Sequence, residues 1–350
     1  MKTLMYKTTS NPDALARILA DRKNLMIIWD AENVANMYDR TGARLSMEVI
    51  PVHFDAVTIQ ADASADDVKK AHKIAAMRDT IRAKEEKAAA ILAAGVENLS
   101  AADRLALLAL VNVAYHNSGK IDTLFSIDST AACEFCERMR AAGANDILMI
   151  CGACYAAADA WKEAAWRMHK LNARILSTVL FTVEELKNLS IPGHLCRMNE
   201  DGDTVNVIMG RNYLRIFQSH QSTRFGYWYK NVPAVAEALH LEGYTTREEL
   251  PDNVRFIHSS ALIGFPAAAT WFDDGIFTVY PDAETTAAAI AAGAWACNGR
   301  KCTACGCHCY TMPRQEKPVY IAEILSRVNK ATVKKIRAAY DARKAQESAA

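Results

Sequence analysis

Nine of the ten cysteines fall into two groups that lie far apart in the sequence. The first group contains two C-x2-C pairs, Cys133 with Cys136 and Cys151 with Cys154. Each pair can turn two thiolates toward one ion, and two pairs complete a tetrahedral shell of four sulfur ligands. The spacing therefore predicts a metal site for Zn²⁺ or an iron–sulfur cluster, since both use four thiolates. The alternative is a set of four buried thiols.

The second cysteine group lies near the C-terminus and holds five cysteines within thirteen residues. Its spacing, Cys297-x4-Cys302-x2-Cys305, is that of plant-type ferredoxins, in which the fourth ligand comes from elsewhere. Cys309, or alternatively Cys307, can supply that ligand. We therefore predict a second, separate metal site, again for zinc or an iron–sulfur cluster.

Polar side chains follow the apolar runs of the second half of the chain, where parallel sheets and α/β barrels build their ligand sites. We predict one pocket in which Asp203 acts as a base, Lys230 holds an anionic group and Tyr229 donates a hydrogen bond. The predicted catalytic residues are Asp203, Lys230 and Tyr229, and the predicted ligand-binding residues are Arg197, Asn199, Asn231 and Ser259. The alternative is helix capping, which suits Asp203, Asn231 and Asp282 because each precedes a helical stretch.

The elements that must position these residues alternate between short apolar runs and helical stretches from residue 121 onward. The predicted strands cover residues 121–127, 194–198, 225–229, 254–258 and 275–280, and the predicted helices cover residues 155–176, 205–219, 232–241 and 284–292. This alternation predicts an α/β fold with parallel βαβ units, either a partial or complete α/β barrel or an open sheet. Cys196 lies inside one apolar run without a cysteine neighbour, so we predict that it binds no metal.

Three segments are expected from these patterns. Residues 1–118 form a mostly helical N-terminal extension, with a strand at 24–30 and helices at 64–94 and 101–116. Residues 119–312 form the cysteine-rich α/β core, and residues 313–350 form a helical tail. Capping boxes at Ser100 with Asp103 and at Thr182 with Glu185 indicate two helix starts.

Composition limits the classes of function. The 350 residues are 51% hydrophobic, which is enough for one large domain or two modest ones. The formal net charge of +1 gives no strong electrostatic footprint for nucleic acid or an anionic membrane. The first residues have no apolar region of the signal-peptide type, and no apolar run reaches the ~18 residues of a membrane span. We therefore expect a cytoplasmic protein.

The order of motifs from about residue 122 to residue 312 resembles the phage gene-product-eighty-eight-like family of phages, mobile elements and gut bacteria. The matching motifs are Cys151-x2-Cys154-Tyr155, Arg197-x-Asn199-x2-Gly202-Asp203, Tyr227–Asn231, Ser259-Ser260, Phe277–Tyr280, and Cys297-x4-Cys302-x2-Cys305 with Cys309-Tyr310. The resemblance implies metal-ligand cysteines and a barrel-like core, but no particular reaction. Cys307 departs from the family pattern, which leaves the fourth ligand of the second site open.

Three functions compete at this point. The first is an enzyme with a metal or iron–sulfur centre and a pocket for an unknown small-molecule or macromolecular ligand. The second is a non-catalytic protein, stapled by zinc, whose surface binds a host or nucleic-acid partner. The third is base modification by a zinc-bearing barrel, which needs a pair of carboxylates such as Asp203 and Asp282.

Overall fold

A computed structural model describes the parts of the chain considered below. These are residues 5–7, 25–29, 34–39, 50–51, 56–58, 65–115, 125–129, 147–150, 163–191, 193–200, 202–297, 302, 305, 309–325 and 330–349. The chain divides into two compact units, residues 1–90 with 154–168, and residues 91–153 with 169–350. Each unit is described by itself.

The first unit contains two small antiparallel sheets and most of a long helix. Strand β1 (Met5–Lys7) pairs with β5 (Ala56–Thr58), and β3 (Val34–Asp39) pairs with both β2 (Leu25–Trp29) and β4 (Ile50–Pro51). Helix α2 covers Ala65–Leu92. The predicted strand at 24–30 and the predicted helix at 64–94 are confirmed, whereas β1, β3, β4 and β5 were not predicted.

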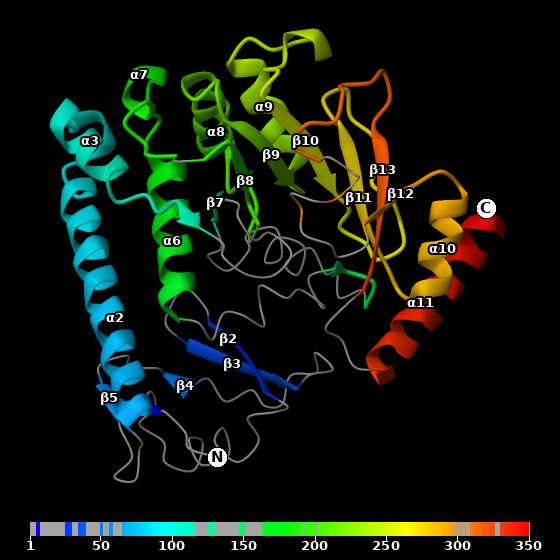
Figure 1. Cartoon of the computed structure of the whole chain (residues 1–350), viewed down its shortest axis with the longest axis horizontal. Coiled ribbons are helices and arrows are strands. Elements are labelled where there is room, and N and C mark those ends of the chain that lie inside the picture. The colour runs from blue at the N-terminus through cyan, green and yellow to red at the C-terminus, as the bar shows by residue number, and fades with distance from the viewer. Residues whose placement is uncertain are drawn as a thin grey trace. The chain divides into compact units, whose positions relative to one another are not determined.

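The second unit is built on an eight-stranded sheet with the order β12-β13-β11-β10-β9-β8-β7-β6 (Figure 1). The strands are β6 (Ala114–Tyr115), β7 (Phe125–Ile127), β8 (Leu195–Met198), β9 (Arg224–Tyr229), β10 (Val254–Ser259), β11 (Gly275–Tyr280), β12 (Trp295–Cys297) and β13 (Val319–Ile324). Every pairing between them is parallel except that of β6 with β7. The predicted α/β class is therefore confirmed, with an eight-stranded, mostly parallel sheet.

Helices separate most of the strands, as the alternation predicted. They are α3 (Ala101–Leu108), α6 (Glu163–Thr178), α7 (Val183–Leu186), α8 (Val207–Ser219), α9 (Val232–Leu241), α10 (Ala283–Ala291) and α11 (Lys330–Ala349), with 3-10 turns at Val96–Asn98 and Arg247–Glu249. Both predicted capping boxes are present, at the starts of α3 and α7. The residue that caps helix α8 is Asn206, whose side chain accepts from the Met209 amide, and not Asp203. None of the helices in the described part of the chain is long and apolar enough to cross a membrane.

One face of the sheet is aromatic and packs against α8. Because side chains alternate along a strand, Phe225, Tyr227 and Tyr229 of β9 share a face. Tyr227 packs against Tyr213 of α8 with ring centroids 5.4 Å apart, and Phe256 of β10 lies 5.6 Å from Tyr227. All five rings are buried, so this face supplies much of the apolar burial that stabilises the unit.

The opposite face of the sheet is covered by the segment that follows the second cysteine group. Tyr310 and Met312 of this segment form a buried cluster with Trp228, Ile257 and Ile321. The Tyr310 ring fits because β9 carries glycine at position 226. A Cβ atom there would lie 2.8 Å from Tyr310 and 2.3 Å from Trp228, distances that side chains do not tolerate.

Candidate functional site

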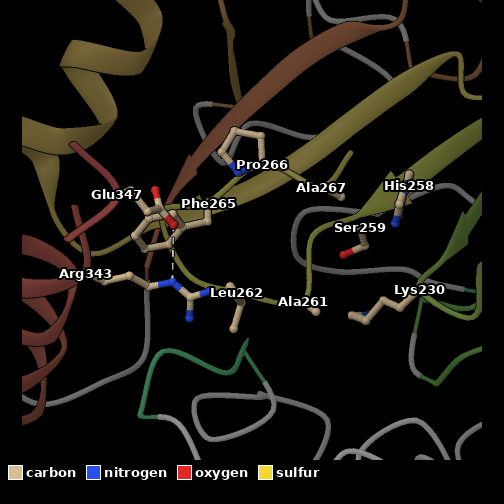
Figure 2. A pocket seen from close by; sticks show the side chains of 10 residues that line it. All are labelled: Lys230, His258, Ser259, Ala261, Leu262, Phe265, Pro266, Ala267, Arg343 and Glu347. Atoms are coloured by element: carbon tan, nitrogen blue, oxygen red, sulfur yellow. Dashed lines mark hydrogen bonds and ion pairs between the residues drawn. The ribbon is translucent and has the colours of Figure 1, made fainter. Parts of the chain in front are cut away.

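A pocket of 450 Å³ lies at the C-terminal ends of β9 and β10. Lys230 follows the last residue of β9, while His258 and Ser259 are the last two residues of β10. The remaining wall comes from the segment 261–267 and from Arg343 and Glu347 of α11. Figure 2 shows Lys230, His258 and Ser259 on one side of the pocket and the α11 pair on the other. The structure thus brings Lys230 and Ser259, both predicted site residues, into one pocket.

The α11 wall is held in place by aromatic packing. Tyr340 packs against Phe265 with ring centroids 5.2 Å apart, and it belongs to a buried cluster with Leu148, Ile263 and Ile336. The Arg343 guanidinium lies over the Phe265 ring at 5.1 Å, and its Nε donates to Glu347 Oε1 at 3.4 Å. A cation stacked on an aromatic ring is partly fixed in position. Arg343 therefore presents a held positive charge to the pocket.

His258 lies against buried groups that fix its ring. The ring stacks on Tyr229 with centroids 5.4 Å apart and an interplanar angle of 13°. Its Nδ1 lies 3.4 Å from Oδ2 of Asp273, which is completely buried. The Tyr229 hydroxyl donates to the other oxygen of Asp273, so this predicted catalytic residue points away from the pocket. Burial raises the pKa of Tyr229 well above its ordinary value, and the charge of Asp273 adds to the rise.

Asp203 lies beside Lys230, as predicted, but behind the pocket wall. Its Oδ1 accepts from the backbone amides of Thr204 at 2.7 Å and Lys230 at 3.0 Å. Its Oδ2 is buried and has no hydrogen-bond partner among the described residues. Burial raises the pKa of this carboxyl, and the positive charge of Lys230 opposes the rise only in part. Asp203 can therefore hold or release a proton, and it also ties the loop after β8 to the loop after β9.

Arg197 does not line this pocket. Its guanidinium lies over the Trp228 ring at 4.1 Å, on the sheet face that Tyr310 covers. The charge of Arg197 also lowers the pKa of Tyr310, although burial raises it more strongly. Asp203 and Lys230 thus lie side by side, with Lys230 alone of the two lining the pocket, while Arg197 contacts Trp228 on the opposite face of the sheet.

The two predicted asparagines brace loops with their side-chain amides. Asn199 accepts from the hydroxyls of Ser129 at 2.8 Å and Tyr213 at 3.0 Å, and its Nδ2 donates to the Trp228 carbonyl at 3.1 Å. Its φ of 57° lies in the left-handed region, which asparagine tolerates better than most residues. Asn231 donates to the carbonyls of Thr204 and Val205 and makes no side-chain cap for α9. Both residues therefore position the strand ends.

Asp282 serves as a helix cap. It accepts from the Thr285 amide at the start of α10 and forms an ion pair with Arg337 of α11 at 2.7 Å. The capping alternative is thus confirmed for Asp282. It is not confirmed for Asp203 or Asn231, neither of which caps the following helix with its side chain.

The four predicted ligands of the first cysteine group, Cys133, Cys136, Cys151 and Cys154, lie outside the described residues. That metal site therefore stays a prediction.

The second cysteine group is partly described. Cys297 ends β12, and Cys302, Cys305 and Cys309 are half-buried, whereas Cys307 lies outside the described residues. The Cys305 amide donates to the Cys302 carbonyl at 3.4 Å, so these two cysteines lie close together. Cys297, Cys302 and Cys309 pack against the cluster around Tyr310. No three His, Cys, Asp or Glu side chains of the described part converge on a point that could hold a metal ion.

Cys196 is buried within β8, on the aromatic face. Burial raises the pKa of its thiol, and the nearby charge of Asp128 adds to the rise. A thiol held in its neutral form is a poor metal ligand, because the thiolate is the binding form. That Cys196 binds no metal stays a prediction.

Two buried carboxylates near the strand ends were not predicted. Asp128 directly follows β7 and accepts from the Ser126 hydroxyl at 2.6 Å and the Glu200 amide at 2.8 Å. The position of Asp128 directly after a predicted strand could have indicated it as a site residue. Asp273 lies shortly before β11, and its contacts with His258 and Tyr229 mark it. Sequence spacing could not reveal those contacts.

No protein-family model, curated protein or solved structure matches this chain.

Proposed function

We propose that this protein binds a small anionic molecule in the pocket at the ends of β9 and β10 and acts on it as an enzyme. The observation that carries the proposal is that two cationic side chains, Lys230 and Arg343, line the same pocket. Only one carboxylate, that of Glu347, stands among its lining residues. Apolar walls with a few convergent polar groups are typical of small-molecule sites, and the volume falls in their usual range.

The position of the pocket supports an enzyme. Strands β7 to β11 follow one another in the sheet in their sequence order, and all are parallel. We propose that this sheet is part of an α/β barrel, because that architecture needs sequential parallel strands. Ligand sites of parallel sheets and barrels lie at the C-terminal ends of the strands, where Lys230 and Ser259 stand.

Calorimetric titration of the full chain with inorganic phosphate tests this proposal. Lys230→Met should weaken phosphate binding about tenfold or more, because a hydrogen bond to a charged group contributes roughly 1.5–3 kcal/mol. Lys187→Met is the matched control, since Lys187 is exposed and pairs with Glu184 outside the pocket. Absence of phosphate binding, or equal binding by Lys230→Met and the control, would contradict the proposal.

We further propose that the cysteine groups hold zinc or an iron–sulfur cluster, at two separate sites. The backbone hydrogen bond between Cys305 and Cys302 and the shared packing of Cys297, Cys302 and Cys309 support the second site. The donor set fits such a group in chemical type, although its sulfur atoms do not converge in the described part. Bound zinc would hold the cysteine-rich segment in a fixed conformation, and an iron–sulfur cluster would supply electron transfer. Clustered thiolates persist in a reducing compartment, so we propose a cytoplasmic location.

Elemental analysis and a visible spectrum of anaerobically purified protein test the metal proposal. A brown protein with iron and sulfide favours redox chemistry. A colourless protein with stoichiometric zinc favours the alternative, a zinc-stapled protein that binds a host or nucleic-acid partner. A folded native chain free of metal would contradict both. The resemblance to the phage family stays a prediction.

A further inference from the structure

His258 stands between the pocket and a buried carboxylate. The residue lines the pocket together with Lys230 and Ser259, and only 8% of its surface is exposed. Its ring is clamped by stacking on Tyr229, while Nδ1 faces Asp273. Because Nδ1 faces the buried Asp273, Nε2 is the ring nitrogen left for the pocket that His258 lines.

The surroundings of Asp273 require it to accept hydrogen bonds. Oδ1 receives the Tyr229 hydroxyl, and Oδ2 receives the Thr270 amide at 2.7 Å. A backbone amide can only donate, and burial keeps the phenol of Tyr229 protonated, so the carboxylate is held as an acceptor. The proton shared with His258 therefore belongs on Nδ1, which leaves Nε2 as the basic nitrogen.

We infer that His258 is the proton-transfer residue of this pocket and that Asp273 is its positioning residue. The inference rests on the proposed function and deepens it, because it assigns the substrate class: a small anion with an ionisable hydroxyl or phosphate oxygen. A carboxylate behind a histidine fixes the ring tautomer and stabilises the imidazolium that forms. The Nδ1 to Oδ2 distance of 3.4 Å is long, and such contacts commonly shorten when substrate binds.

The step balances without a co-reactant. Nε2 accepts a proton from the substrate oxygen, the O–H bond breaks, and an N–H bond forms. The positive charge on the ring then faces Asp273, and the negative charge on the substrate oxygen faces Lys230. The same nitrogen returns the proton later. The titratable groups around the ring are Asp273 and Tyr229 behind it and Lys230, Arg343 and Glu347 around the pocket.

Long-range ¹H–¹⁵N spectra of the full chain, labelled at histidine, test the inference. The His258→Gln variant identifies the ring resonances of His258. In the free protein we expect the proton on Nδ1 and a bare Nε2. Inorganic phosphate added at constant neutral pH should shift Nε2 toward its protonated form, because the anion stabilises the imidazolium. A merely structural histidine would not change its protonation on phosphate binding.

Binding data separate the possible outcomes. His258→Gln should weaken phosphate binding about tenfold, while His240→Gln, at an exposed position of α9, should leave it unchanged. If phosphate binds in a Lys230-dependent way but the His258 resonances do not move, this inference is overturned and the proposed function stands. If phosphate does not bind, both fail. A proton on Nε2 in the free protein would also overturn the inference. This measurement uses the unmodified protein, so it does not depend on whether an Asp273 variant folds.

Discussion

The two ends of the parallel strands use their charged residues differently. At the N-terminal ends, Asp274 accepts from Arg247 and Arg314, each at 3.1 Å, and Arg314 also donates to the carbonyls of Leu250 and Val254. At the C-terminal ends, Lys230 and Arg343 line a pocket.

The first set of charges is joined by ion pairs to a buried carboxylate, whereas the second set lines a pocket, where Arg343 pairs with Glu347. Under the proposed function, stability and ligand binding would depend on different ends of the same parallel strands, as in α/β barrels.

The largest effect should come from breaking the N-terminal cluster. Asp274→Ala leaves the partly buried guanidinium groups of Arg247 and Arg314 without their shared carboxylate. It also removes the acceptor of the Phe256 amide. We expect a loss of about 3–5 kcal/mol in the free energy of unfolding, measured by urea denaturation. Phosphate affinity per folded molecule should stay unchanged. A large fall in affinity without a loss of stability would contradict the division of roles.

A smaller effect of opposite sign should follow at the pocket end. Asp203→Asn keeps an oxygen for the amides of Thr204 and Lys230 but removes a buried charge. The pKa of Asp203 is raised in the folded state, so the folded protein binds this proton more tightly than the unfolded chain. Its ionisation therefore costs stability as the pH rises from the ordinary value of 3.8 through the raised folded-state value.

Asp203→Asn should thus stabilise the protein by about 1 kcal/mol at neutral pH, and the gain should vanish in acid. Denaturation at several pH values measures it. Weaker phosphate binding in the same variant would show that this carboxylate is kept for function at a cost in stability. Destabilisation at neutral pH would show that Asp203 mainly supports the loops.

The smallest change in stability is expected from a substitution in the middle of the sheet, between the two strand ends. Cys196 lies within β8 and is completely buried. Cys196→Ala should cost only about 0.5–1 kcal/mol, from the small void it leaves, and metal content per chain should not change. Elemental analysis checks this, with Cys302→Ala as the matched variant that should lose metal. Loss of a metal equivalent from Cys196→Ala would contradict its exclusion as a ligand.

The regular part of the fold could be predicted from the sequence because local patterns determine it. Apolar runs located β8, β9, β10 and β11 to within a residue or two, and capping residues located the starts of α3 and α7. Strand β13 was missed because its sequence, VYIAEI, lies in a segment expected to be helical. Its partner β11 is about forty residues earlier, and such pairing leaves no local pattern.

The candidate site could be predicted only where it depends on strand ends. Lys230 and Ser259 follow from their positions at those ends. Arg343 reaches the pocket because Tyr340 packs on Phe265, and Asp273 matters because it meets His258 and Tyr229. Both contacts join segments whose proximity depends on the whole fold. Sequence spacing also could not show that Arg197 stacks on Trp228 of the neighbouring strand β9.

Asp273 and Asp274 are consecutive residues whose carboxylates serve different tasks. One holds the pocket histidine, and the other holds the two arginines of the opposite strand ends. A single inserted or deleted residue between them and β11 would displace both carboxylates together. The β10–β11 connection should therefore tolerate a change of length only in its earlier part, before the two aspartates.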